Sequence, residues 1–164
     1  MPNIHLQLLI EAPAEIIYNA VTKHEGLSAW WTPGTQAKVQ LNSLLRFPFG
    51  EGYFKEMKLT VLKPLEQVEW NCIKGASEWI GTNISFKLLP GDKQSLLHAH
   101  PEMLGQIEQQ KTDKATLLIF HHDDWKAYTP MFAECSFTWV QFLKSLKLLC
   151  ETGKGRPWPD QHHT

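Results

Sequence analysis

The sequence predicts a single α+β domain, in which a meander of antiparallel strands packs against one long C-terminal helix. Two observations carry this prediction: a strand-like alternation over residues 3–10 leads into a series of short strand-like segments, and an amphipathic helix runs from Pro130 to about Glu151. With 164 residues, the chain is long enough for one domain with a substantial core. We expect the domain to cover residues 1–153, followed by a tail at 154–164.

The N-terminal part of the chain is typical of one strand followed by two short helices. Leu6 and Leu8 alternate with polar residues, which indicates a strand with one buried face. Pro13 suits the first turn of a helix, because its missing N–H would have no partner there. A second short helix is predicted at 25–31, and Pro33-Gly34 ends it.

A meander of short strands follows, which brings the expected sheet to about seven strands. Turn residues separate the segments, and the absence of helices between them favours antiparallel pairing. The excursion at 90–113 is longer than a hairpin loop and mostly polar, and a helical turn is expected near 102–109. The strands are predicted at 35–41, 44–50, 53–63, 66–74, 78–89 and 114–123.

The last helix carries one broad apolar stripe with Trp139 near its centre. Such a stripe needs a concave apolar partner, and the curved meander supplies one. The stripe consists of Phe132, Cys135, Ser136, Trp139, Phe142, Leu143, Leu146, Leu149 and Cys150.

Composition excludes several classes of function. The net charge is -1 and the charges are interleaved, so no basic face for nucleic acid is present. No run approaches the ~18 apolar residues that span a membrane, and Met1 to Ile10 lacks the pattern of a secretory leader. The three cysteines are far apart, which is typical of buried thiols in a reducing compartment. We therefore expect a cytoplasmic protein without membrane insertion.

A series of short motifs extends over nearly the whole chain. They are Ala12-Pro13-Ala14-Glu15 with Tyr18 and Ala20, Leu27 with Trp30-Trp31, Phe47-Pro48-Phe49-Gly50, Val68 with Trp70, Glu78-Trp79, Phe120 with His122 and Trp125, and Trp139 with Leu143 and Ser145-Leu146-Lys147. In this order the chain resembles the START-like, birch-pollen-allergen superfamily, and within it the family named after the activator of the heat-shock chaperone ATPase. It departs from that family at Asn42-Ser43, where a Gly-Gly pair is frequent, and in the length of the 90–113 excursion.

The resemblance implies a helix-grip fold that encloses a cavity between sheet and helix. Members of the superfamily hold lipids, sterols, polyketides or plant hormones there, and a minority catalyse cyclisation. The function predicted for this chain is binding of a small apolar molecule, lipid-like or polyketide-like, without a cofactor. The residues expected to line the cavity are Trp139, Phe142, Cys135, Leu146, Tyr53, Met57, Trp70, Phe86, Phe120 and His122.

Two alternative functions stay open. One is a protein-interaction module that regulates a heat-shock chaperone ATPase, as the family name implies. The other is a cyclase-type enzyme that uses the same cavity through single polar groups, for which Glu78, His122, Tyr53 and Lys55 are candidates. Each of the four is more simply explained as a rim residue where a strand end meets water. No nucleophile elbow, phosphate loop or dinucleotide motif is present, so no catalytic residue is assigned.

The histidine pairs do not predict a metal centre. His98 and His100 fall in the irregular excursion, while His121 and His122 are adjacent on a strand. Neighbouring residues of a strand point to opposite faces, so the latter two cannot share an ion. No metal ligand is therefore assigned from the sequence.

Overall fold

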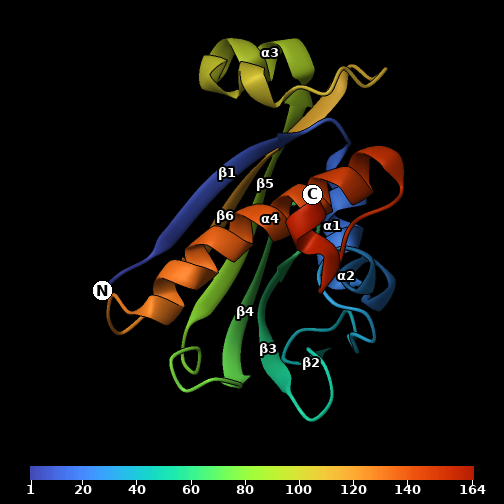
Figure 1. Cartoon of the computed structure of the whole chain (residues 1–164). Helices are drawn as coiled ribbons and strands as arrows, with labels where there is room; N and C mark the ends of the chain where they lie inside the picture. The colour runs from blue at the N-terminus through green and yellow to red at the C-terminus, as the bar shows by residue number, and fades with distance from the viewer.

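Six antiparallel strands form one curved sheet in the computed structural model, which describes residues 1–164 (Figure 1). Their order across the sheet is β1-β6-β5-β4-β3-β2, so the N-terminal strand lies at one edge beside the last strand. This arrangement confirms the predicted α+β helix-grip class. The strands are β1 (Ile4–Ile10), β2 (Leu44–Pro48), β3 (Phe54–Lys63), β4 (Gln67–Lys74), β5 (Asn83–Asp92) and β6 (Lys114–Asp123).

The long helix α4 (Pro130–Thr152) lies across the concave face of the sheet. Its boundaries follow from local chemistry. The Thr129 side chain accepts a hydrogen bond from the Phe132 N–H at 3.1 Å, and Gly153 ends the helix in the left-handed conformation with φ 87°. Two short helices, α1 (Ala14–Thr22) and α2 (His24–Trp30), close one end of the gripped space. No helix has both the length and the apolar character needed to cross a bilayer.

Two strand predictions are wrong. Residues 35–41 do not form a strand: Gln36 makes an isolated bridge with Arg46, and beyond it Val39 and Leu41 are exposed to solvent. The sheet therefore has six strands instead of about seven. The strand predicted at 78–89 begins only at Asn83, since the chain turns through Gly81 at φ 90° before it.

The concave space is filled by aromatic side chains. Trp31 lies at the centre of this group. Its ring stacks on Trp70 with 5.8 Å between centroids, and its centroid lies 5.2 Å from that of Trp139 and 4.4 Å from that of Phe47. We call Trp31 with these three rings the Trp31 hub. Offset and edge-to-face pairs of this kind contribute about 0.5–1.5 kcal/mol each beyond the area they bury. The middle of the sheet and the middle of α4 thus meet through a solid aromatic core.

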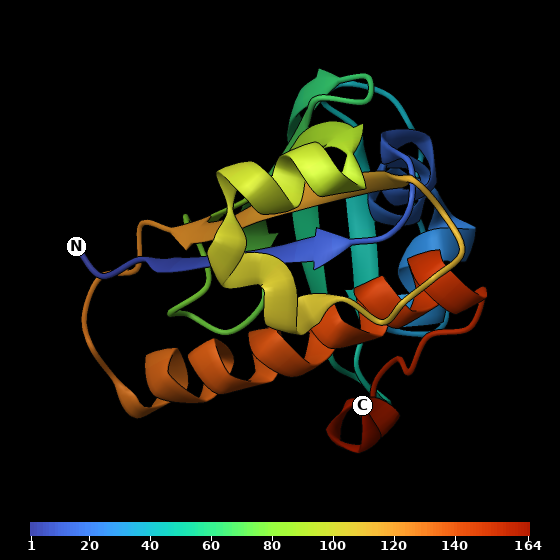
Figure 2. The same cartoon turned by 90° about the horizontal axis from the view of Figure 1, so that it is seen from above.

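The 90–113 excursion contains more helix than the single turn predicted near 102–109. It contains α3 (Lys93–Ala99) and the 3-10 helix η1 (Pro101–Gln106), which pack on the outer face of the sheet. Met103 is buried there against Leu9 and Leu117, in a small second core. Seen from above, α3 and α4 lie on opposite sides of β1 and β6 (Figure 2).

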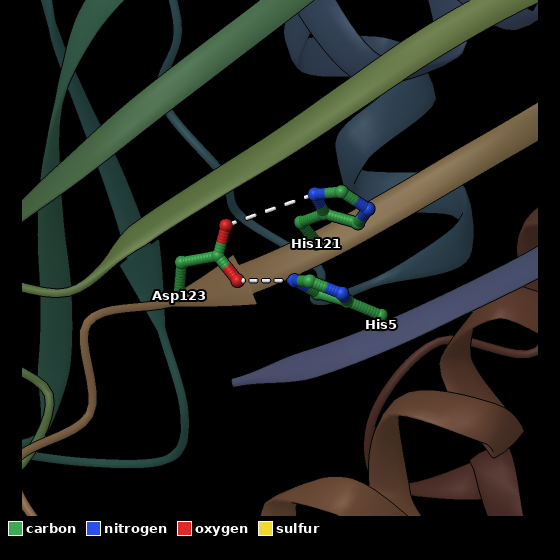
Figure 3. Close-up of side chains that lie close together, drawn as sticks. All are labelled: His5, His121 and Asp123. Atoms are coloured by element: carbon green, nitrogen blue, oxygen red, sulfur yellow. Dashed lines mark hydrogen bonds and ion pairs between the residues drawn. The ribbon is translucent and has the colours of Figure 1, made fainter. Parts of the chain in front are cut away.

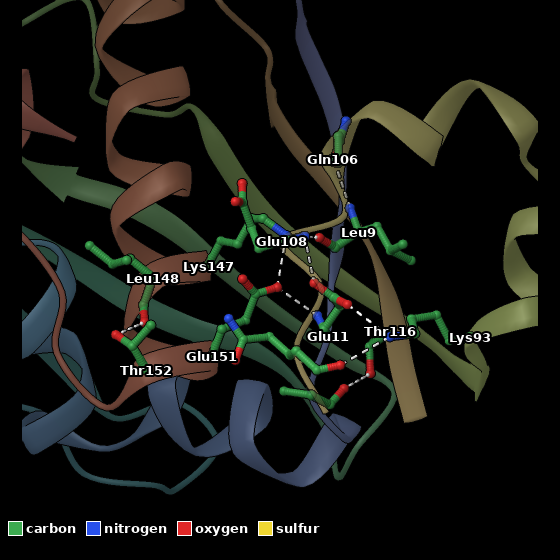
Figure 4. Close-up of polar contacts among 12 residues, drawn as sticks. Leu9, Glu11, Lys93, Gln106, Glu108, Thr116, Lys147, Leu148, Glu151 and Thr152 are labelled. Carbon is green, nitrogen blue, oxygen red and sulfur yellow. Dashed lines mark hydrogen bonds and ion pairs between the residues drawn. The ribbon is translucent and has the colours of Figure 1, made fainter. Parts of the chain in front are cut away.

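A buried polar network ties the excursion to the rest of the domain (Figure 4). The Glu11 carboxylate is fully enclosed and accepts hydrogen bonds from Lys93 Nζ at 2.9 Å and from the Glu108 N–H at 2.8 Å. Glu151 accepts one from the Glu11 N–H at 2.8 Å and one from Lys147 Nζ at 2.7 Å. Burial opposes ionisation of Glu11, but these bonds outweigh it, and the pKa of the Glu11 carboxyl is lowered.

Candidate functional site

A pocket of about 230 Å³ opens beside the N-terminal half of α4, where the helix passes the beginning of β3. We call it the aromatic pocket. A cavity of ~150 Å³ suffices for benzene, and pockets for drug-sized ligands are about 300–1,000 Å³, so this space suits a molecule of about one to two rings. Its lining residues are Trp31, Phe49, Tyr53, Lys55, Ala76, Trp79, Met131, Glu134, Cys135, Thr138, Trp139 and Phe142.

Lys55 is the one cation in the wall of the aromatic pocket. It follows Phe54 at the beginning of β3, and the alternation of the strand turns its side chain to the concave face. Its Nζ lies 4.2 Å from the centroid of the Phe49 ring, 4.3 Å from that of Trp79 and 5.4 Å from that of Tyr53. A cation over aromatic faces gains about 0.5–2 kcal/mol per contact, and here those contacts replace an acidic partner.

The Lys55 ammonium has no ion pair. All salt bridges of the chain involve other residues, and no hydrogen bond of Lys55 Nζ is formed within the chain. Burial lowers the pKa of Lys55 to about 8. Burial also raises the pKa of the neighbouring Cys72 and Cys135 thiols, so both stay neutral. Near pH 7 the pocket therefore holds the unpaired Lys55 ammonium among mostly apolar walls and neutral thiols. Glu134 is the one acidic residue of the lining, and it forms no ion pair with Lys55.

Behind the pocket, a chain of hydrogen bonds fixes two of its walls. The Trp139 indole N–H donates to His122 Nδ1 at 3.0 Å, and His122 Nε2 lies 2.8 Å from Thr82 Oγ1. Because an indole N–H can only donate, Nδ1 must be the acceptor and Nε2 carries the proton. Thr82 then donates to the Trp79 carbonyl at 2.6 Å. Burial, with the Lys55 charge as a second cause, lowers the pKa of His122 to about 3.

His122 is consequently a structural residue here. Both ring nitrogens are engaged and its side chain is fully buried, so neither is free to exchange a proton with a bound molecule. Its role is to hold Trp139 and Trp79 in place as walls of the aromatic pocket.

The structure brings four of the ten predicted lining residues to the aromatic pocket. These are Tyr53, Cys135, Trp139 and Phe142. The remaining six, Met57, Trp70, Phe86, Phe120, His122 and Leu146, are packed in the core and do not line it. The physical reason is the Trp31 hub, which fills the concave space under the middle of α4, so that the aromatic pocket lies toward the N-terminal end of the helix.

Several pocket residues were missed by the sequence reasoning. Trp79 lies in the irregular turn before β5, where no periodicity reveals which way a side chain points. Phe49 and Trp31 were noticed only as motif residues. Lys55 is named in the sequence analysis only as a catalytic candidate, and its alternation with the buried Met57 along the strand is the signal that indicates its place on the inner face. Of the other catalytic candidates, Tyr53 lies at the rim and Glu78 is outside the lining.

Comparison with known proteins gives one result for the sequence and one for the structure. No family model matches the sequence, and no curated protein matches it. Among solved structures, the chain is similar to the Aha1 dimer from Colwellia psychrerythraea, with 32% identity over 94% of this chain and 100% of that chain and a TM-score of 0.72.

Two further structures share the fold at lower identity. CalU16 from Micromonospora echinospora is 15% identical over 98% of this chain and 80% of its own, with a TM-score of 0.63. DynU16, a protein of the dynemicin biosynthetic locus, is 17% identical over 93% of this chain and 48% of its own, with a TM-score of 0.64. At these identities the similarity shows the helix-grip fold alone.

Proposed function

The chain belongs to the Aha1 family, and we propose that it binds a small, largely apolar molecule that carries an acidic group in the aromatic pocket. The observation that supports this proposal best is the unpaired Lys55 ammonium, which three aromatic rings surround. The ring walls accept the apolar body of the ligand, and the ammonium accepts its anionic group.

The acidic group follows from the energetics of Lys55. A cation taken out of water is destabilised unless a partner replaces its hydration, and the lowered pKa expresses that penalty. A carboxylate or enolate of the ligand would supply a charge-assisted hydrogen bond, which is worth about 1.5–3 kcal/mol. A neutral ligand of the same shape would gain only the burial of its apolar surface.

The size of the pocket restricts the apolar part. With about 230 Å³ available, a long acyl chain or a four-ring sterol would not be enclosed. We therefore propose a compact aromatic acid or an equally small polyketide-like acid as the ligand class. Tyr53 lies at the rim, and its hydroxyl accepts a hydrogen bond from the Ala76 N–H at 3.2 Å, so that hydroxyl is held beside the entrance.

A matched pair of probes tests this proposal. We expect 2-naphthoate to bind the native chain and 2-naphthamide, its neutral counterpart, to bind more weakly, as followed by quenching of tryptophan fluorescence. Lys55→Met should weaken naphthoate binding by about tenfold or more and leave naphthamide binding unchanged.

Lys58→Met is the control variant, because Lys58 lies on the same strand but is exposed on the opposite face. It should bind both probes as the native chain does. Equal binding of naphthoate by the Lys55→Met and Lys58→Met variants would refute a role for the Lys55 ammonium.

Membership of the Aha1 family favours a second candidate function, which is interaction with a heat-shock chaperone and stimulation of its ATPase. The exposed aromatic ring of Phe137 on the outer side of α4 offers one apolar contact for such a partner, with 64% of its surface accessible. The test is the ATPase rate of the purified chaperone with and without the chain. Phe137→Ser should reduce any stimulation, whereas Lys55→Met should not, so the two functions are separable.

A further inference from the structure

Two histidines and one aspartate meet on the outer face of the sheet, the face opposite the one that borders the aromatic pocket (Figure 3). His5 on β1 is directly opposite His121 on β6 in the antiparallel register. Asp123 lies two residues beyond His121 and therefore on the same face. Their ligand atoms all lie within 4.8 Å of one another. We call these three residues the His5 cluster.

The carboxylate of Asp123 joins both rings. Its Oδ1 lies 2.7 Å from His5 Nε2, and its Oδ2 lies 3.7 Å from His121 Nδ1. The two imidazoles stack with 3.7 Å between centroids and 19° between planes. One nitrogen of each ring thus faces the same carboxylate, and no helix covers this end of β1 and β6, because α3 and η1 pack at the other end.

We propose that the His5 cluster binds a divalent first-row transition ion such as Zn²⁺. Two imidazole nitrogens and one carboxylate oxygen are ligands that suit these ions. Bond lengths of about 2.0–2.2 Å place neighbouring tetrahedral ligands about 3.3 Å apart. The two nitrogen-to-oxygen separations of 2.7 and 3.7 Å bracket that value. Because the stacked rings direct their lone pairs nearly in parallel, both rings must rotate for their nitrogens to converge on one ion, and the half-exposed position of His5 leaves room for this.

Water would complete the coordination on the solvent side. His5 keeps 53% of its side chain accessible, His121 34% and Asp123 30%, so an ion enters without any opening of the core. The field around the cluster also favours a cation. In the row of paired residues across the sheet, His5 and His121 are followed by Ser85 and Glu69, which adds a second carboxylate on the same face.

The sequence does not indicate this cluster, because the only histidine next to His121 along the chain is His122. The structure confirms that those two point to opposite faces, with His122 fully buried. The true partner of His121 is 116 positions away along the chain, and only the β1–β6 register brings it near.

Calorimetric titration of the purified full chain with ZnCl₂ tests the site. We expect saturable binding that His5→Gln, His121→Gln and Asp123→Asn each weaken by at least about tenfold. His100→Gln is the matched control, because His100 also pairs with a carboxylate, that of Glu102 at 3.4 Å, but belongs to no group of three ligand residues. That variant should bind Zn²⁺ as the native chain does.

A second measurement separates loss of the site from loss of the fold. Thermal unfolding of each variant without metal should match the native chain, because the replaced side chains are partly exposed. Titration with CoCl₂ should give a visible absorption band that disappears in His5→Gln. The proposal is overturned if the three cluster variants bind Zn²⁺ as tightly as the native chain, or if His100→Gln abolishes binding.

Discussion

Replacing Trp139 by Phe is expected to destabilise the domain by more than the loss of ring size explains. The substitution removes the hydrogen bond that the Trp139 indole N–H donates to His122 Nδ1, with 3.0 Å between the two nitrogens. The buried Nδ1 is then left without a partner. An unsatisfied buried acceptor costs about 1–3 kcal/mol, and the smaller ring loses about 1–2 kcal/mol of burial. The free energy of unfolding at pH 7 should therefore fall by about 2–5 kcal/mol, measured by urea denaturation followed by circular dichroism.

Trp70→Phe is the control for this experiment. Trp70 is also fully buried, but its indole N–H has no hydrogen-bond partner, so the same change of ring removes no bond. It should cost only the burial part, about 1–2 kcal/mol. If the two variants lose equal stability, the hydrogen-bond chain from Trp139 to Thr82 does not contribute to the fold and the reasoning fails.

Three further predictions concern charged groups. Glu11→Gln should lower the free energy of unfolding by about 2–4 kcal/mol, since it leaves the partly buried Lys93 ammonium without its acid. Hydrogen exchange in that variant should accelerate in residues 93–113 before it does in β3 and β4, and uniform acceleration would contradict this prediction. The free energy of unfolding should fall by roughly 3–5 kcal/mol as the pH drops from 6.5 toward 3, because His122 is protonated in that window in the unfolded chain but not until about pH 3 in the folded chain. Urea unfolding at a series of pH values measures this dependence. His122→Gln should make it flatter, and an unchanged slope would count against the prediction. Naphthoate affinity should fall as the pH rises through about 8, where Lys55 loses its proton, whereas naphthamide affinity should stay constant.

Much of the fold could be predicted because its signals are local. Thr129, Pro130 and Gly153 mark the ends of α4 by chemistry that involves only neighbouring residues. The strand predicted at 35–41 failed for the opposite reason. Its apolar residues Val39 and Leu41 alternate like those of a strand, but no neighbouring strand pairs with them and they stay exposed.

The candidate site was only partly predictable. Alternation over the strand predicted at 53–63 indicates that Tyr53 and Lys55 share one face, and the helical stripe indicates that Trp139 faces the sheet. Which of the inner-face residues border the aromatic pocket depends on how the aromatic rings of the core pack. The stack of Trp31 on Trp70 fills the space beside some of these residues and leaves it open beside others. The charge state of Lys55 likewise depends on its burial and on the lack of an ion pair with any acid, which a single sequence does not reveal.

The most direct test of the central claim is the protonation of Lys55 itself, followed by NMR of the chain carrying ¹³Cε-labelled lysine. In the free chain, we expect one lysine to titrate with a pKa of about 8 and to be missing from the Lys55→Met variant. Saturation with 2-naphthoate should raise that pKa, because an anion beside Nζ stabilises the ammonium, whereas 2-naphthamide should leave it in place. A Lys55 that titrates at the ordinary value of ~10.4, unmoved by naphthoate, would contradict the proposal that the aromatic pocket recognises an acidic ligand.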